Sequence, residues 1–211
     1  MKIRYLETVN STQVYLKKLV KEKKVTPPYG LVANHQTAGI GSRENIWIGL
    51  KGNLFFSFAL SLDKLPKDLK LESASIYFAY LLKETLFELD SKVWLKWPND
   101  FYVKDKKIGG MITTIVSNSL ICGVGINLVN TPQNFSKLDI NISRDKLLKN
   151  YIDKIDRNLE WKQVFSKYKL EFDKNKNFST HIKHTKISLN NVSLQSDGSI
   201  IYKNERMYSL R

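Results

Sequence analysis

The sequence is poor in several features that would place it in a particular class of protein. It has a single cysteine, Cys122, so no disulfide forms within the chain. A lone thiol in an apolar run is more typical of a small buried hydrophobic residue than of a nucleophile. No apolar run approaches the ~20 residues that cross a bilayer, and the N-terminus lacks the apolar segment of a secretory signal. These absences favour a cytoplasmic protein that does not enter a membrane.

Arginine and histidine are also scarce, although the net charge is +14. A basic nucleic-acid-binding module is the alternative that this charge raises, but direct base readout favours arginine. The lysines are spread along amphipathic segments and the aromatic residues fall on apolar faces, so we predict no DNA partner. His181 and His184 are three residues apart without nearby cysteines or paired acids, so we predict no metal site in the protein.

With 211 residues and 42% hydrophobic content, the chain supports one medium-sized domain and a small appendix. A polar linker at 174–177 suggests a main domain over residues 1–175 and a C-terminal β module over 176–211. Asp197-Gly198 between apolar runs is a strong hairpin signal in that module. About 35 residues cannot build an independent core, so the module must pack on the main domain.

The main domain reads as alternating strands and helices, followed by strands alone. Because the last strands are separated by short turns, they must pair antiparallel, which disfavours a doubly wound parallel sheet. The predicted fold class is therefore α+β, with a mixed or antiparallel sheet flanked by helices. We expect helices starting after Asn10-Ser11-Thr12 and over 71–89, 143–159 and 161–172, and strands over 2–9, 30–36, 53–62, 93–96, 101–103, 107–117 and 119–127.

The stretch from Lys96 to Gly110, KWPNDFYVKDKKIGG, concentrates the most chemistry. Pro98 cannot continue a central strand, and Asn99-Asp100 is a turn pair. A hairpin with a polar tip at 104–106 brings Asn99 and Asp100 beside Lys107 and the following glycines. An edge strand with a solvated basic turn is the structural alternative.

Two further stretches carry glycines in places where close approach matters. Gln36 leads into a long polar loop over 37–51, whose glycines allow backbone amides to approach an anion. Gly123-Val124-Gly125-Ile126-Asn127 lacks side-chain bulk on one face of a strand, which suits either close packing or the floor of a flat ligand site. We expect the loop to be mobile without ligand and ordered with it.

These three stretches, in this order over roughly residues 10 to 130, resemble the signature of the biotin protein ligases. The resemblance implies a class II synthetase/biotin ligase-like fold with a shortened SH3-like C-terminal module. It also implies the form of the family that lacks an N-terminal DNA-binding domain. The activity implied is activation of biotin by Mg-ATP to biotinyl-5′-AMP, followed by transfer to a lysine of a biotin carboxyl carrier protein or carrier domain. The oligomeric state is left open.

The resemblance also assigns residues. The catalytic group comprises Lys107, Asp100 and Asn99. Biotin contacts are expected from Ser11, Thr12, Gln13, Gln36, Gly39, Lys107, Gly110, Gly123 and Gly125. Nucleotide contacts are expected from Ile40, Gly41, Ser42, Arg43, Trp47, Lys96, Asn99 and Asn127.

The sequence departs from the family pattern at two points. Gln13 stands where asparagine is common, and Gly39-Ile40-Gly41-Ser42 replaces a Gly-Arg-Gly-Arg loop, which leaves Arg43 to supply the cation. Lipoyl or octanoyl transfer on a related fold is the enzymatic alternative. It lacks support, because the glycine-rich segment of those enzymes has no match in this chain.

Overall fold

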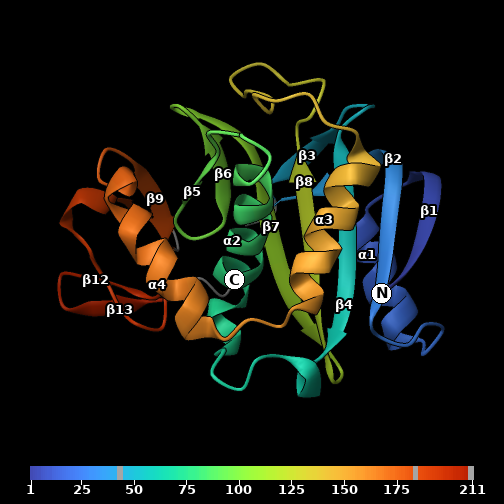
Figure 1. Cartoon of the computed structure of the whole chain (residues 1–211), viewed down its shortest axis with the longest axis horizontal. Coiled ribbons are helices and arrows are strands. Elements are labelled where there is room, and N and C mark those ends of the chain that lie inside the picture. Colours follow the sequence, from blue (N-terminus) through green and yellow to red (C-terminus); the bar gives the residue numbers. More distant parts are fainter. Residues whose placement is uncertain (42–44, 183–184, 209–211) are drawn as a thin grey trace.

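The computed structural model describes residues 1–41, 45–182 and 185–208 of the chain. Its centre is an eight-stranded sheet with the order β1-β2-β4-β8-β7-β6-β5, in which β3 pairs with β2 (Figure 1). The strands are β1 Lys2–Val9, β2 Tyr29–Ile40, β3 Ile46–Gly49, β4 Leu54–Ser61, β5 Trp94–Lys96, β6 Asp100–Val103, β7 Lys106–Val116 and β8 Ser119–Ile126.

Helices connect and cover this sheet. The α-helices are α1 Thr12–Lys21, α2 Ala74–Phe87, α3 Arg144–Asp156 and α4 Trp161–Glu171. Short 3-10 turns lie at η2 Leu62–Lys64, η3 Leu71–Ser73, η4 Phe172–Asn175 and η5 Leu189–Asn191. Among the residues described, none of the helices is long and apolar enough to span a membrane.

Strand directions follow the lengths of the connections. β1 and β2 are parallel, because α1 carries the chain back across the sheet between them. The run β6-β7-β8 is antiparallel throughout, as are β2 with β4 and β4 with β8. The predicted mixed, mostly antiparallel sheet is therefore confirmed.

Helix α1 begins where the sequence indicates. Ser11 has an extended backbone and its hydroxyl accepts a hydrogen bond from the amide of Val14, which is the N-cap arrangement. The buried side chains of this helix include Leu16, Leu19 and Val20. The helix therefore brings the polar residues of its first turn to the sheet at a defined position.

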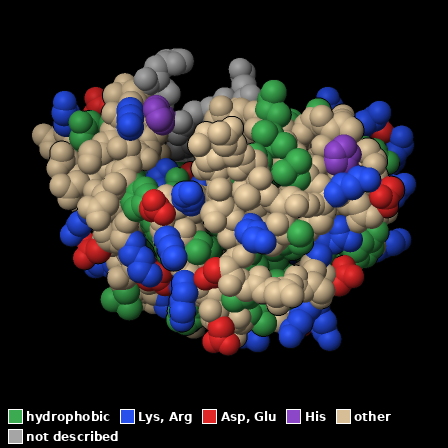
Figure 2. All heavy atoms as spheres, turned by 90° about the horizontal axis from the view of Figure 1, so that it is seen from above, with side chains coloured by type: hydrophobic (Ala, Val, Ile, Leu, Met, Phe, Trp, Pro, Cys, Tyr) green, Lys and Arg blue, Asp and Glu red, His purple; other side chains and the backbone are tan. Residues whose placement is uncertain are grey.

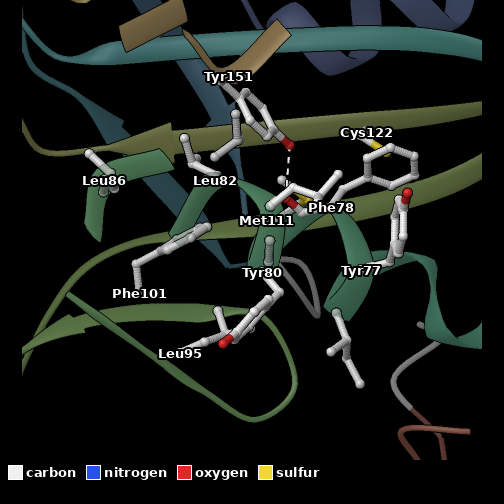
Figure 3. Close-up of a cluster of buried hydrophobic side chains, with 14 of the residues drawn as sticks. Tyr77, Phe78, Tyr80, Leu82, Leu86, Leu95, Phe101, Met111, Cys122 and Tyr151 are labelled. Atoms are coloured by element: carbon white, nitrogen blue, oxygen red, sulfur yellow. Dashed lines mark hydrogen bonds between the residues drawn. The ribbon is translucent and has the colours of Figure 1, made fainter. Parts of the chain in front are cut away.

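The two faces of the sheet are filled by two separate hydrophobic clusters. Helices α2 and α3 cover one face, which is in front in Figure 1, and α1 covers the other. On the α2 face the core is aromatic, and the Tyr151 hydroxyl of α3 donates 2.9 Å to the carbonyl of Phe78 in α2 (Figure 3). The face under α1 has a smaller cluster, built on Leu16, Leu31 and Ile121.

The C-terminal segment forms two small antiparallel sheets, as predicted for a β module. Strands β9 Ser179–Ile182 and β10 Thr185–Ser188 form one, and β11 Ser193–Leu194, β12 Ile200–Tyr202 and β13 Glu205–Met207 form the other. Ile187, Leu189 and Ile200 belong to the same buried cluster as the α2 face of the main sheet. The module therefore shares the core of the main domain, and a boundary near residue 175 stays a prediction.

One predicted element is wrong in its extent. The strand expected over 30–36 continues to Ile40, and Ile46–Gly49 pairs back onto it, so most of the predicted loop over 37–51 is a β-hairpin. The glycines that suggested a loop serve strand pairing. A Cβ on Gly39 would lie 2.5 Å from the carbonyl oxygen of Trp47, and one on Gly49 would lie 2.6 Å from that of Gln36.

The face of the molecule seen in Figure 2 carries charged side chains of both signs. In the view of Figure 2, lysine and arginine side chains are scattered among acidic ones instead of gathering in a single block. This distribution agrees with the interpretation of the +14 charge as a general surface property.

Candidate active site

A cavity opens on the α1 face of the sheet, where α1, the β2–β3 hairpin, β4 and strands β6 to β8 meet. The space between its lining side chains, including the part open to solvent, is about 480 Å³. It is lined by Ser11, Thr12, Gln13, Gln36, Ile40, Gly41, Trp47, Ser57, Asp100, Lys107, Gly110, Met111, Ile112, Gly123, Val124 and Gly125.

The floor of the cavity is strand β8, where two glycines remove side-chain bulk. Gly125 is paired with Gly110 and Gly123 with Ile112 on β7. A Cβ on Gly123 would lie 2.5 Å from Gln13 Oε1, and one on Gly125 would lie 2.7 Å from the Trp47 ring. The two glycines are two residues apart, so they lie about 7 Å from each other along one face of the strand.

A network of hydroxyl and amide groups forms the wall beside Gly123. The Ser57 hydroxyl donates 2.8 Å to Thr12 Oγ1, and the Thr12 hydroxyl and backbone amide donate to Gln36 Oε1 at 3.1 and 2.8 Å. These side chains are buried. They come from α1, β2 and β4, so the way these three elements pack together determines which donors and acceptors face the cavity.

Gln13 adds an acceptor that the protein leaves unused. Its Nε2 donates 3.3 Å to the carbonyl of Ile121, which orients the amide. Its Oε1 is buried without a hydrogen-bond partner among the described residues. An unsatisfied buried acceptor costs free energy, so this oxygen marks a position where a ligand donor would be stabilised.

Lys107 reaches the cavity because of a β-bulge. Asp100 pairs with Gly110 and Phe101 with Gly109, but Tyr102 pairs with Lys107, so Ile108 is an extra residue in β7. In a regular ladder Lys107 would point to the opposite face from Gly110, since side chains alternate. The extra residue reverses that alternation and places Lys107 on the face of Asp100.

Asp100 therefore lies between two lysines. Its Oδ1 is 2.6 Å from Lys107 Nζ, and its Oδ2 is 3.7 Å from Lys96 Nζ. Burial and then the negative charge of Asp100 raise the pKa of the neighbouring Tyr102 to about 12, so that phenol stays neutral. The cluster of Asp100, Lys107 and Lys96 has a net positive charge and suits an anionic ligand group.

Trp47 closes the cavity over Gly125. It lies on β3 opposite Gly39, and its ring meets that of Phe135 edge-on at 6.2 Å between centroids. Its Nε1 is buried without an acceptor in the part of the chain that is described. The hairpin thus supplies a flat apolar cover with one unused donor.

Four predicted site residues do not line the cavity, as far as the described residues extend: Gly39, Lys96, Asn99 and Asn127. Asn99 Nδ2 donates 2.7 Å to the carbonyl of Met111, so it holds β6 against β7. Asn127 donates to Ser136 and Thr131 and therefore ties down the loop after β8. Asn99 immediately precedes β6 and Asn127 immediately follows β8. At such positions backbone carbonyls lack partners in the sheet, and the side-chain amides of both residues donate to them.

Two predicted nucleotide contacts, Ser42 and Arg43, lie outside the described residues, as does His184. Conversely, the cavity includes Ser57, Met111, Ile112 and Val124, which sequence reasoning missed. Ser57 had a signal, since it is the one hydroxyl inside the apolar run 54–60. The described residues contain no group of three or more His, Cys, Asp or Glu side chains placed to hold a metal ion.

Comparisons with known proteins agree on one family. A model of the biotin/lipoate A/B protein ligase family matches residues 5–129. The chain is 30% identical over 130 residues to the bifunctional ligase/repressor BirA of Escherichia coli, which is 58% of this chain and 39% of that protein. The chain therefore spans about two fifths of the length of this curated relative.

Solved structures match over nearly the whole chain. Biotin acetyl coenzyme A carboxylase synthetase from Helicobacter pylori, solved with bound biotinylated ATP, has a TM-score of 0.94 at 40% identity and covers 98% of this chain and 99% of its own. The biotin protein ligase of Aquifex aeolicus, in complex with biotin and ATP, has a TM-score of 0.81 at 24% identity over 100% of this chain and 96% of its own. The latter likeness concerns the fold alone.

Proposed function

The chain belongs to the biotin/lipoate A/B protein ligase family, and from that premise we propose that it is a biotin–protein ligase. It activates biotin with ATP to biotinyl-5′-AMP and transfers the biotinyl group to a lysine of a carrier protein. The carrier is the biotin carboxyl carrier protein or the carrier domain of a biotin-dependent carboxylase, such as acetyl-CoA carboxylase. The name of the Helicobacter pylori relative supports this choice of partner.

The observation that carries the proposal is the unused acceptor of Gln13 at one end of a cavity whose other end holds Lys107. Biotin has a cyclic urea with two N–H donors at one end and a carboxylate at the other. Gln13, Thr12 and the other polar groups beside Gly123 suit the urea, and Lys107 beside Gly110 suits the carboxylate. The bare floor at Gly123 and Gly125 accommodates the fused rings between them.

Lys107 addresses the main difficulty of the first step, which joins two anions. An oxygen of the biotin carboxylate attacks the α-phosphorus of ATP, the bond to the bridging oxygen breaks, and pyrophosphate leaves with its electron pair. A preorganised cation between the carboxylate and the α-phosphate stabilises the charge that develops there. Asp100 holds the Lys107 ammonium in place at 2.6 Å, and Asn99 holds the strand that carries Asp100.

In the second step the amine of the carrier lysine attacks the carbonyl carbon of the mixed anhydride. The carbon–oxygen bond to the phosphate breaks, AMP leaves, and the amine proton passes to solvent as the amide forms. The cover formed by Trp47 excludes water from the anhydride until the carrier arrives. Ile40 and Gly41 line the same cavity as Trp47 and belong to the proposed nucleotide site.

Mg²⁺ belongs to the nucleotide substrate in this scheme. Protein-bound Mg²⁺ is usually held by one or two carboxylates together with substrate phosphates. Asp100 is the carboxylate that lines the cavity among the residues described, and both of its oxygens face lysines. A Mg²⁺ ion arriving on ATP would therefore be held chiefly by the substrate phosphates. We also infer a cytoplasmic location, which rests on the single, fully buried Cys122.

The test is to incubate the protein with Mg-ATP, an apo-carrier domain, and either biotin or lipoate. We expect intact-mass spectrometry to detect one biotinyl group on the carrier, only when ATP is present. Modification by lipoate alone would replace the proposal with lipoyl ligation. A carrier that stays unmodified by both, together with a salt-dependent shift of DNA in a gel, would favour a nucleic-acid-binding function.

A further inference from the structure

The turn between β11 and β12, residues 195–199, contacts Trp97, which lies three residues before Asp100. Trp97 is fully buried, and both of its N–H donors cross to the C-terminal part of the chain. Its backbone amide donates 2.7 Å to Asn175 Oδ1, and its indole Nε1 donates 2.9 Å to the carbonyl of Gly198.

Trp97 lies in a very short connection. Residues 97–99 join β5 to β6, and the residues on either side, Lys96 and Asp100, are paired directly across the ladder. The far end of the connection is held to β7, where Met111 donates 3.0 Å to the carbonyl of Asn99. Because the connection is only three residues long, a shift of Trp97 would also shift Lys96 and Asp100.

The contact surface offered by the 195–199 turn is itself rigid. The Asp197 carboxylate accepts hydrogen bonds from the amide and hydroxyl of Ser199 at 3.1 and 2.5 Å. The Ser73 hydroxyl at the start of α2 donates to the Asp197 carbonyl. Gly198 has φ +77°, and a Cβ there would lie 2.9 Å from Ile76 Cδ1, so the turn fits closely against α2.

We propose that Trp97 is a positioning residue that transmits the placement of the C-terminal module to the Asp100–Lys107 pair. The route runs from Gly198 in the module through Trp97 to Asp100, and Asn175 at the end of the main domain holds the backbone amide of Trp97 on the same side. The module then has a function in the first chemical step without touching a substrate. This inference rests on the proposed function only for its effect on catalysis, since the effect on the Asp100–Lys107 pair is structural.

The chain provides a matched control at Trp161. Its Nε1 donates 2.8 Å to the carbonyl of Ser196 in the same turn, and its side chain is also buried. Trp161 lies on α4 and is not part of the 97–99 connection. Trp97→Phe and Trp161→Phe thus each remove one indole hydrogen bond to one turn, but only the first acts on the connection to Asp100.

The experiment compares the wild-type protein with Trp97→Phe, Asn175→Ala and Trp161→Phe. We expect Trp97→Phe and Asn175→Ala to slow biotinyl-AMP formation by on the order of tenfold to a hundredfold, because small misplacements of reacting groups are costly. Biotin affinity without ATP, measured by calorimetry, should fall by less than the rate, because the urea contacts are distant and only the contact of Lys107 with the carboxylate is disturbed. Trp161→Phe should form the adenylate at the wild-type rate even where its melting temperature falls.

A second measurement does not depend on catalysis. Labelling by an amine-reactive ester, read by peptide mass spectrometry, should be slow at Lys107 in the wild-type protein, because Asp100 holds the ammonium, and fast at exposed Lys106. We expect faster labelling of Lys107 in Trp97→Phe and Asn175→Ala but not in Trp161→Phe. The ratio of Lys107 to Lys106 labelling corrects for general reactivity.

The outcomes separate the two proposals. If the wild-type protein forms no adenylate while the labelling pattern holds, the proposed function fails and the positioning by Trp97 stands. If Lys107 labelling is the same in all four proteins, or if Trp161→Phe loses as much activity as Trp97→Phe, the positioning role is overturned. If circular dichroism shows that Trp97→Phe does not fold, the same comparison of adenylate formation and Lys107 labelling is made with Asn175→Ala.

Discussion

Lys107 and Asp100 form an ion pair at 2.6 Å although the ladder pairs Asp100 with Gly110 and Lys107 with Tyr102. The pair exists because the extra residue Ile108 reverses the alternation of β7 between the two. Ile108 itself is fully buried in the core on the α2 face. Packing of Ile108 on the α2 face of the sheet therefore fixes the positions of Lys107 and Asp100 on the opposite face.

Lys107→Ala should slow adenylate formation by about 2–4 kcal/mol in activation free energy, the scale of losing one preorganised charged donor. Lys104→Ala and Lys106→Ala remove the same charge from the same hairpin, but these side chains are exposed and should change the rate little. Single-turnover formation of biotinyl-AMP measures the effect. An equal loss in Lys106→Ala would contradict the register described for this hairpin.

Gly123→Ala should weaken biotin binding by at least about tenfold, or ~1.4 kcal/mol. The added Cβ would lie 2.5 Å from Gln13 Oε1 and 3.2 Å from Ser57 Oγ, within the proposed urea site. Calorimetric titration with biotin measures this. Gly30→Ala is the control, because its Cβ would crowd Ile3 and Phe56 away from the cavity, and it should reduce stability while leaving biotin affinity unchanged.

The β2–β3 hairpin should exchange its amide hydrogens faster in the free protein than with biotinyl-AMP bound. Ile46 is 81% exposed and Ile48 is 52% exposed, so few apolar contacts hold the outer side of this hairpin. Hydrogen–deuterium exchange over peptides covering residues 38–48 measures the change, with the β7–β8 turn at 117–118 as an internal reference. Slow exchange in the free protein, unaltered by ligand, would contradict the expectation of a closing lid.

The stability of the protein in acid should depend on Asp197. Burial acts to raise the pKa of this carboxyl, but hydrogen bonds from Ser199 and the charges of Arg206 and Lys70 outweigh it, so its pKa lies below the ordinary value. A lowered pKa in the folded state contributes stability above the unfolded pKa of about 3.9, and this contribution is lost as the pH falls through the folded value.

Asp197→Asn should therefore be less stable than the wild-type protein at neutral pH, by on the order of 1–3 kcal/mol for bonds to a charged group. The difference should shrink as the pH falls below about 4. Urea unfolding at several pH values measures both effects. Asp173→Asn, at a carboxylate that is 81% exposed in its pair with Lys176, should change neither; a constant difference between Asp197→Asn and wild type at every pH would exclude this explanation.

Local patterns in the sequence determined much of the fold. Short polar turns between apolar runs require antiparallel pairing in the region of β6, β7 and β8, whatever the rest of the chain does. Ser11 caps α1 because its hydroxyl reaches an amide three residues away, which is a property of the local backbone. The short turn at 104–106 likewise requires β6 and β7 to pair, which brings the backbone of Asp100 and that of Lys107 into the same hairpin.

Tertiary structure decided what depends on contacts between distant segments. Gly39 and Gly49 look like loop residues in the sequence, and only the approach of β3 to β2 makes them pairing positions. The residue spacing in the sequence does not predict the bulge at Ile108. The bulge is fixed by the hydrophobic core on the α2 face, which buries the Ile108 side chain. Asn99 donates to a backbone carbonyl of β7, and Asn127 donates to the carbonyl of Ser136 in the loop after β8. These partners are set by the path of the folded chain, and no local pattern specifies them.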